Sequence, residues 1–504
     1  MIKNIGAIII CNITIYFVLT LLLLYIIKNK KIKKLDVYKS QEELNYKQEI
    51  SKLNKRIEEL EEKISIQNIL NHASVENEIN EKIYYMNKLI DKYNDYAIGY
   101  YFRGNLYLKF EKYEEALTDF NKALELDNNN KEAYRGKGVC LSRQGNYHDA
   151  IDNYKKAIEI DDTYEVAYYN MGICYSRLKK YYKAINSYSK AIELDKNDIS
   201  AYYNRGRNYN RVCRYDDAVK DFTKAINLEK FDDRLYYNRG ISYSLMEKHE
   251  EALDDYMMAI DLNQDFEEVY YYAGFSYYLL GKYFDAIDYF SMAIELDSEY
   301  EQAYYGRGLA YSKMDNYYEA VKDFNEVISI NSKNAKAYYK RGLALDNMER
   351  YEDAIEDFTK AIELNYKDEN IYYNRGTSKS LIRDLQGAKE DLTKALEYNK
   401  EEFRIYDVRG MIHLELKEYD EAIDDFTESL RLLKSSISYY YRGIAYFEKR
   451  EFMKAVDDFS NAIELDPQDL KSYQNRGDAY CNLGNYDEAI KDFAVVTKLE
   501  KELK

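Results

Sequence analysis

A 34-residue period governs most of this sequence. Twelve glycines recur at steps of 34 residues with a single step of 33, and each has a tyrosine four residues before it and an alanine twelve residues after it. Four residues beyond the alanine lies an aromatic residue, except in one copy that has Leu392. The glycines are Gly104, Gly138, Gly172, Gly206, Gly240, Gly274, Gly308, Gly342, Gly376, Gly410, Gly443 and Gly477. A fixed period of this length indicates stacked structural repeats.

Each copy predicts two antiparallel α-helices. Apolar residues follow helical spacing in two stripes, and a polar break such as Gly145 to Tyr147 or Gly281 to Tyr283 separates them. The chain has one proline in 504 residues, so long helices are not interrupted. One helix pair cannot bury both of its faces, and neighbouring pairs therefore have to stack into a solenoid.

The spacing resembles the tetratricopeptide repeat (TPR), whose pattern is W-x2-L-G-x2-Y, then A-x3-F, A and P. Here tyrosine takes the place of tryptophan, and only Pro467 fills the proline position. The resemblance covers residues 97–504 as twelve repeats. It implies an all-α, right-handed superhelix. Positions are numbered below so that the recurring glycine is position 8 of each repeat.

The residues before the repeats predict three further segments. Residues 5–27 contain no charge and are long enough to cross a bilayer, and Lys28, Lys30, Lys31, Lys33 and Lys34 follow directly. We expect residues 1–34 to form an uncleaved transmembrane anchor with a basic flank, with a cleaved signal peptide as the rival reading. The lysines place the repeats in the cytoplasm by the positive-inside rule.

Residues 35–70 predict a helical spacer. Its apolar residues Ile50, Leu53, Ile57, Leu60 and Ile64 are spaced as in a heptad repeat. Two to three heptads make a weak coiled coil, so weak self-association through residues 46–64 and a single solvated helix stay open as alternatives. Residues 71–96 read as a degenerate half-repeat that supplies a second helix before the twelve repeats at 97–504.

An arginine precedes the glycine in nine repeats, as in the "YYNRG" of Tyr202 to Gly206. The same nine repeats have aspartate at position 23, and the other three have neither residue. In an antiparallel hairpin, positions 7 and 23 lie at about the same height. This covariation predicts a structural ion pair inside each repeat, against a ladder of charges for a ligand or common descent of the repeats.

Two rows of side chains are candidates for peptide binding. In the TPR family the first helix of each pair lines the concave surface, chiefly through positions 2, 5, 6, 9, 12 and 13. By resemblance, the asparagines at position 6 are expected to bond the backbone of an extended peptide; they are Asn170, Asn204, Asn238, Asn374 and Asn475. Position 5 is mostly tyrosine, so the carboxylate clamp of the family's chaperone-tail binders is not expected.

Position 13 carries a basic row in the first four repeats: Lys109, Arg143, Arg177 and Arg211, with Arg207 nearby at position 9. The formal net charge of the chain is -17, so a basic row inside it is a candidate site for an acidic segment of a protein partner. The alternative is that these side chains are only solvated or paired with nearby acids. Nucleic acid is not an expected partner of so acidic a chain.

Catalysis is not expected. No phosphate-binding loop, HExxH or GxSxG motif occurs, no Cys and His cluster has metal-ligand spacing, and no cofactor is implied. The five cysteines are read as buried reduced thiols. We therefore expect a membrane-tethered scaffold that binds a peptide or a partner protein in the TPR groove. The alternative is an extracytoplasmic TPR protein in envelope assembly or adhesion.

Repeats nine and ten are the least regular. Lys379 and His413 occupy position 11, which is usually tyrosine, and Leu392 replaces the aromatic residue. We expect a local loosening or a change of superhelical pitch near residues 376–440.

Overall fold

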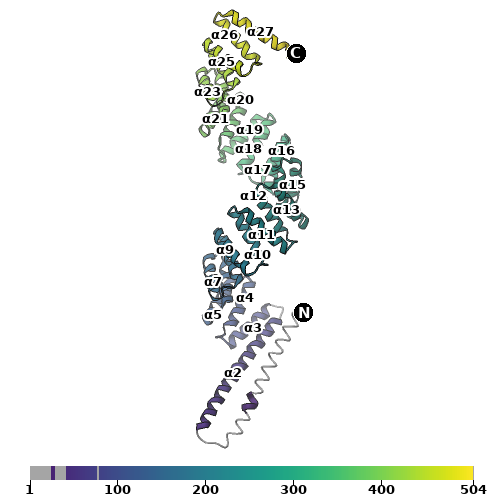
Figure 1. The fold of residues 1–504 in the computed structure, drawn as a ribbon, viewed down its shortest axis with the longest axis vertical. Coiled ribbons are helices and arrows are strands. Elements are labelled where there is room, and N and C mark those ends of the chain that lie inside the picture. The colour runs from purple at the N-terminus through teal and green to yellow at the C-terminus, as the bar shows by residue number, and fades with distance from the viewer. Residues whose placement is uncertain (1–23, 29–40, 76–78, 503–504) are drawn as a thin grey trace. The chain divides into compact units, whose positions relative to one another are not determined.

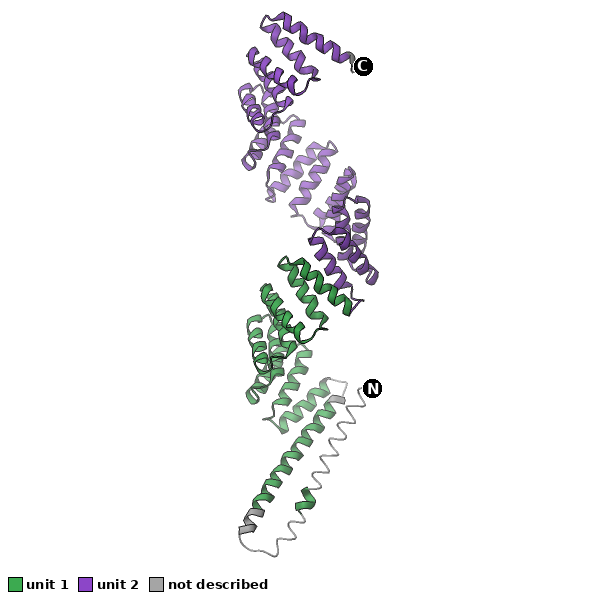
Figure 2. Ribbon diagram, in the orientation of Figure 1, with its two compact units in different colours: residues 1–228 green, residues 229–504 purple. Residues whose placement is uncertain are grey.

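The computed structural model describes residues 24–28, 41–75 and 79–502 (Figure 1). Every element given below from these ranges is an α-helix. The chain divides into two compact units, residues 1–228 and residues 229–504 (Figure 2).

The first unit holds the spacer helix and four repeats. Its helices are α2 (Gln41–Val75), α3 (Ile79–Lys92), α4 (Ala97–Lys109), α5 (Tyr113–Leu126), α6 (Lys131–Arg143), α7 (Tyr147–Ile160), α8 (Glu165–Arg177), α9 (Tyr181–Leu194), α10 (Ile199–Arg211) and α11 (Tyr215–Leu228). From α4 onward, the even-numbered helix is the first of each repeat and the odd-numbered helix is the second.

The second unit holds the other eight repeats. Its helices are α12 (Asp233–Leu245), α13 (His249–Leu262), α14 (Glu267–Leu279), α15 (Tyr283–Leu296), α16 (Glu301–Lys313), α17 (Tyr317–Ile330), α18 (Ala335–Asn347), α19 (Tyr351–Glu363), α20 (Glu369–Leu381), α21 (Leu385–Tyr398), α22 (Phe403–Glu415), α23 (Tyr419–Leu432), α24 (Ser436–Glu448), α25 (Phe452–Leu465), α26 (Leu470–Asn482) and α27 (Tyr486–Glu502). The stacked helix pairs predicted from the period are confirmed inside each unit.

The core of each repeat comes from the small and aromatic residues of the period. Ala354, Phe358 and Ala361 of α19 are completely buried. A Cβ atom added at Gly342 would lie 2.7 Å from the Phe358 ring. The glycine is therefore needed because the backbone of the first helix lies directly against the aromatic residue of the second.

The turn between the two helices has one backbone conformation. Position 15 has a positive φ in all twelve repeats, between 56° and 85°. Glycine occupies this position only at Gly145, Gly281 and Gly484, and the other nine repeats place a larger residue such as Glu349 in the left-handed region. These nine turns carry a backbone strain that the helix packing has to offset.

Side chains at the repeat junctions cap the first helices. The side chain of Asn130 accepts a hydrogen bond from the Ala133 amide, and Asp198 and Asn334 cap α10 and α18 in the same way. Capping satisfies amides that have no partner within the helix, so each helix has a fixed start.

The end of α2 packs against the first repeat. Ile66 and Ala73 of α2 form one core with Met86 and Leu89 of α3, and Ile98 of α4 packs against it. The seam residues from Ile50 to Ile64 are half-buried. The C-terminal part of α2 thus serves α3 as a first helix, where the sequence indicated only a half-repeat. The division into anchor, spacer and repeats stays a prediction.

The predicted membrane localisation is contradicted. Most of the segment 5–27 lies outside the described residues. Within the ranges that are described, no helix is both long and apolar enough to cross a membrane. We therefore correct the prediction of a single-pass membrane protein with cytoplasmic repeats.

The cysteine prediction is correct in part. Cys140 and Cys174 are buried, and Cys174 donates a hydrogen bond of 3.4 Å to Ser142. Burial raises the pKa of Cys140 to about 12, which keeps it a thiol. Cys213 is exposed, because it occupies the turn at position 15 of its repeat. Cys11 lies outside the described residues.

Candidate functional site

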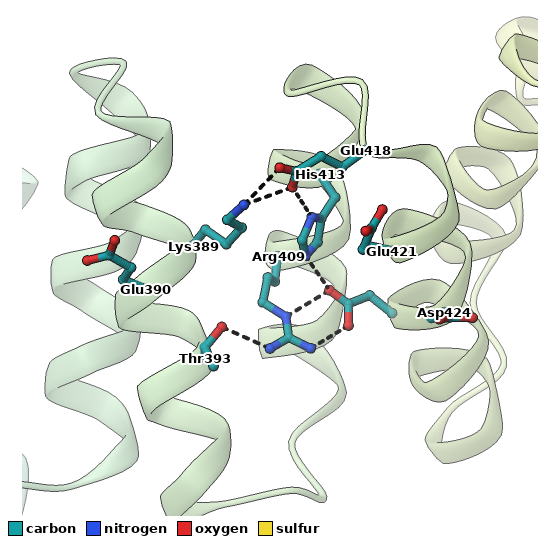
Figure 3. A pocket seen from close by; sticks show the side chains of 9 residues that line it. Lys389, Glu390, Thr393, Arg409, His413, Glu418, Glu421 and Asp424 are labelled. Carbon is teal, nitrogen blue, oxygen red and sulfur yellow. Dashed lines mark hydrogen bonds and ion pairs between the residues drawn. The ribbon is translucent and has the colours of Figure 1, made fainter.

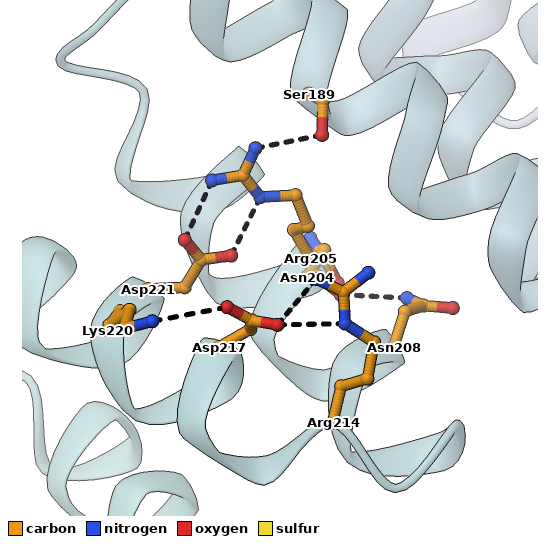
Figure 4. A network of polar contacts seen from close by, with 8 residues as sticks. All are labelled: Ser189, Asn204, Arg205, Asn208, Arg214, Asp217, Lys220 and Asp221. Carbon is orange, nitrogen blue, oxygen red and sulfur yellow. Dashed lines mark hydrogen bonds and ion pairs between the residues drawn. The ribbon is translucent and has the colours of Figure 1, made fainter.

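The arginines at position 7 form the ion pairs predicted from their covariation with aspartate. In Arg205, Nε donates a 2.7 Å hydrogen bond to Oδ2 of Asp221, and Nη2 donates a 2.7 Å hydrogen bond to Oδ1 of the same carboxylate (Figure 4). The same two-bond geometry occurs at Arg103, Arg239, Arg307, Arg341, Arg375, Arg409, Arg442 and Arg476. The internal structural pair is confirmed for all nine repeats.

The same arginines also contact the preceding repeat. Nη1 of Arg205 donates a 2.8 Å hydrogen bond to Ser189, at position 25 of the preceding second helix. Equivalent bonds join Arg307 to Ser291, Arg341 to Asn325, Arg375 to Thr359, Arg409 to Thr393, Arg442 to Thr427 and Arg476 to Ser460, and Arg103 to Asn87 of α3. One guanidinium therefore connects three helices, and a ligand-binding ladder is not needed to explain it.

The pairs are buried on the aspartate side. The Asp357 side chain is 6% exposed, whereas that of Arg341 is 22% exposed. The guanidinium carbon of Arg341 lies 5.4 Å from the centroid of the Tyr338 ring, at position 4. Burial raises the pKa of Asp357, and the two hydrogen bonds from Arg341 oppose this shift. The first tyrosine of "YYNRG" thus covers the arginine as well as packing the hairpin.

The asparagines at position 6 bond the neighbouring first helix. Asn204 Nδ2 donates a 3.1 Å hydrogen bond to the Tyr169 hydroxyl and a 3.0 Å bond to the Ser200 carbonyl. Asn374 and Asn475 donate in the same way to Tyr339 and Tyr440, each at position 5 of the preceding repeat. Asn238 donates to the Arg234 carbonyl. Asn170 follows a repeat with Arg135 at position 5, so it has no equivalent tyrosine acceptor.

The basic residues at position 13 lie at one end of their helices. Lys109, Arg143, Arg177 and Arg211 are the last residues of α4, α6, α8 and α10, and all four are exposed. These helices contact one another in sequence within the first unit, so their ends form a row. Among the described residues, no carboxylate forms an ion pair with any of the four. Arg207 is exposed as well, and its guanidinium lies 5.6 Å from the Tyr203 ring.

A pocket of about 520 Å³ lies where repeats nine and ten meet (Figure 3). His413 Nδ1 is 2.6 Å from Glu418, and Nε2 is 3.6 Å from Asp425. Lys389 donates two 2.9 Å hydrogen bonds to Glu418 and holds the pKa of that carboxyl below its ordinary value. The described helices continue through residues 376–440, and the expected loosening stays a prediction.

A second pocket, of about 230 Å³, opens on first helices of the second unit. Tyr278, Leu309, Lys313, Lys340 and Leu343 line it from α14, α16 and α18. These residues occupy positions 6, 9, 12 and 13, the positions that line the concave surface in the family. Neither lysine was among the predicted site residues.

Comparison with known proteins identifies the repeats. Models of the tetratricopeptide repeat match most of residues 95–491; the matches are 95–163, 166–198, 199–232, 234–266, 274–315, 301–334, 335–365, 373–436, 436–469 and 459–491. The chain belongs to the tetratricopeptide repeat family. TPR proteins serve protein–protein interaction and peptide binding and are typically not enzymes. Among curated proteins, none matches this sequence.

Solved TPR structures resemble parts of the chain. YrrB, described as a TPR protein with an unusual peptide-binding site, is 27% identical, and the match covers 36% of this chain and 95% of YrrB with a TM-score of 0.33. MamA is 26% identical over 34% of this chain and 94% of its own, with a TM-score of 0.32. A TPR protein from Parabacteroides merdae is 21% identical over 49% and 98%, with a TM-score of 0.39.

The sequence held signals for two features that we did not predict. Every position 7 arginine follows a repeat with serine, threonine or asparagine at position 25, whereas the repeats before Met171 and Ala273 have Lys155 and Met257 there. Tyr278 stands at position 12, where Ser142, Ser176, Ser244 and Ser312 stand in other repeats. Both departures can be seen once the repeats are aligned. The described residues include no group of His, Cys, Asp or Glu that could hold a metal ion.

Proposed function

We propose that this TPR chain is an interaction scaffold whose first four repeats bind an acidic peptide segment of a partner protein. The observation that carries the proposal is the row Lys109, Arg143, Arg177 and Arg211, which is exposed and without carboxylate partners in the described structure. Charged side chains in a row favour a partner of opposite charge and steer its approach.

The asparagines at position 6 also favour peptide binding by the first helices. In Asn204 and Asn374 the amide nitrogen is held by a neighbouring hydroxyl, so the orientation of the side chain is fixed. No donor among the described residues bonds the side-chain carbonyl of either one. Asn170, Asn204, Asn238 and Asn374 would then accept hydrogen bonds from the backbone amides of an extended peptide.

The basic residues at position 13 can also affect the stability of their helices, and this effect has to be distinguished from an effect on binding. A cation in the last turn of a helix interacts favourably with the helix dipole, by roughly 0.3–1 kcal/mol. Charge reversal at these positions will therefore lower stability slightly even without a ligand, and the melting curve of each variant must be measured beside its binding.

The test is a capture experiment with residues 97–504. The variant Arg143→Glu, Arg177→Glu, Arg211→Glu should lose partners that the wild-type protein retains. The control variant Lys122→Glu, Lys155→Glu, Lys190→Glu reverses three exposed lysines on second helices and should retain them. If the arginine variant retains every partner while remaining folded, the proposal is wrong.

A further inference from the structure

The pocket on α14, α16 and α18 is large enough to hold a side chain of a bound peptide. Its volume of about 230 Å³ equals the space of about eight water molecules in the liquid. Three successive first helices at the usual spacing of about 8–10 Å extend over roughly 20 Å. An extended segment of about six residues crosses that distance.

The pocket has two positive charges and no negative one. Lys313 ends α16 and is exposed, and Lys340 of α18 is half-buried. No carboxylate in the described part of the chain forms an ion pair with either ammonium. The Lys340 ammonium lies 5.4 Å from the Tyr339 ring. Burial and the charge of Lys313 lower the pKa of Lys340, whereas Asp368 opposes the shift.

This arrangement is unfavourable without a ligand. Partial burial of a cation costs free energy unless an anion compensates it, and a second cation nearby adds repulsion. In the ion pairs at position 7 of the same two repeats, Asp323 and Asp357 supply the anion. At Lys313 and Lys340 no carboxylate of the described residues lies within ion-pair distance, so a bound anion would compensate both charges.

The rest of the lining mixes apolar side chains with the polar side chains of Ser312, Tyr317 and Asn347. Tyr278, Leu309 and Leu343 contribute an aromatic ring and two aliphatic side chains. The Tyr278 ring stacks with Phe275, with 6.4 Å between centroids, so its position is fixed from the same helix. The pocket therefore offers a contact for an apolar group next to a negative charge.

We propose that this pocket binds an aspartate or glutamate side chain from an extended segment of a partner protein. The carboxylate lies between Lys313 and Lys340, and an apolar neighbouring residue of the segment packs against Tyr278 and Leu309. The proposal rests on peptide binding by the first helices, and it adds a second subsite with a defined acidic-apolar preference.

The test uses the full chain and a labelled, amidated peptide GSLDLSG, with its Asp→Asn analogue as the neutral reference. We expect the Asp peptide to bind the wild-type protein at least about tenfold more tightly at low salt, as a charged hydrogen bond contributes. The preference should fall to within about twofold in Lys313→Met, Lys340→Met. It should persist in Lys322→Met, Lys360→Met, which removes exposed second-helix lysines of the same two repeats.

Three outcomes would overturn the proposal. The first is equal binding of the two peptides by the wild-type chain, and the second is an unchanged preference in Lys313→Met, Lys340→Met with an unchanged melting curve. The third is tighter binding of GSLNLSG with a free carboxyl end, which would make the pocket a reader of chain ends. Retention of the Asp preference by Arg143→Glu, Arg177→Glu, Arg211→Glu separates this subsite from the basic row of the first unit.

Discussion

At the scale of single residues, the guanidinium at position 7 is the principal polar connection of each repeat. Arg341 uses two nitrogens for Asp357 and the third for Asn325 in the preceding repeat. Such a group sets the register inside a hairpin through the ion pair, because loss of the aspartate leaves an unpaired, partly buried charge, and it adds a hydrogen bond between hairpins.

We expect Asp357→Asn to lower the free energy of unfolding by about 3 kcal/mol, because Arg341 then remains buried without its anion. The double variant Arg341→Met, Asp357→Leu should recover most of this loss in urea denaturation. The matched control is Asp353→Asn in the exposed pair with Arg350, which should cost less than about 0.5 kcal/mol. Equal effects at Asp353 and Asp357 would contradict the structural role.

A second residue-scale prediction concerns pH. Burial, the charge of Asp198 and a hydrogen bond with that carboxyl raise the pKa of Glu165 from 4.5 to about 7. A carboxyl with a higher pKa in the folded chain takes up a proton on folding, so its contribution to stability falls as the pH rises through this window.

Glu165→Gln should therefore stabilise the protein above about pH 7, by roughly 1 kcal/mol after allowance for solvent screening, and should have little effect near pH 4.5. Urea denaturation at both pH values measures this. A gain that does not change with pH would exclude a shifted carboxyl.

At the scale of the element, the turn at position 15 is the strained part of the hairpin. Glu349→Gly should raise stability by about 0.5 kcal/mol, because glycine adopts positive φ without steric cost. Gly281→Ala is the reverse test, since no atom lies within 4 Å of the added Cβ and only the backbone is strained. Stabilisation by Gly281→Ala would show that the turn is not strained.

Most of the helix arrangement could be predicted because every repeat carries nearly the same pattern of residues. The glycine, the alanines and the Arg–Asp covariation together predict the hairpin. The third arginine bond was missed because its partner, such as Ser189 for Arg205, lies in another repeat and has three residue types. The exposure of Cys213 was missed because all five cysteines were interpreted together as buried thiols, without regard to the turn at position 15.

Less of the candidate site than of the fold could be predicted from the sequence. A pocket such as the one at Lys313 and Lys340 depends on which side chains of three helices meet, and one sequence does not fix this. Tyr278 at a serine position was the visible sign. The membrane prediction rested on hydropathy before the repeats and on no feature of the repeats themselves, and it is contradicted by the described structure.

At the scale of the whole molecule, stability is a sum over neighbouring repeats. Inside each unit, helices contact only their near neighbours along the chain. Deletion of residues 335–368, one complete repeat, should leave a folded protein, because Arg375 would then meet Asn325 in place of Thr359. Circular dichroism per residue should be unchanged. Loss of helix beyond the deleted repeat would contradict nearest-neighbour stability.

We propose that the row Lys109, Arg143, Arg177 and Arg211 on the first helices of the first four repeats recognises acidic peptides. The most direct measurement is selection of a random peptide library on residues 97–504, beside the variant Arg143→Glu, Arg177→Glu, Arg211→Glu. We expect the selected peptides to be enriched in aspartate and glutamate over the starting library, and this enrichment to fall in the variant. Selected peptides without acidic enrichment, or the same enrichment in both proteins, would contradict the claim.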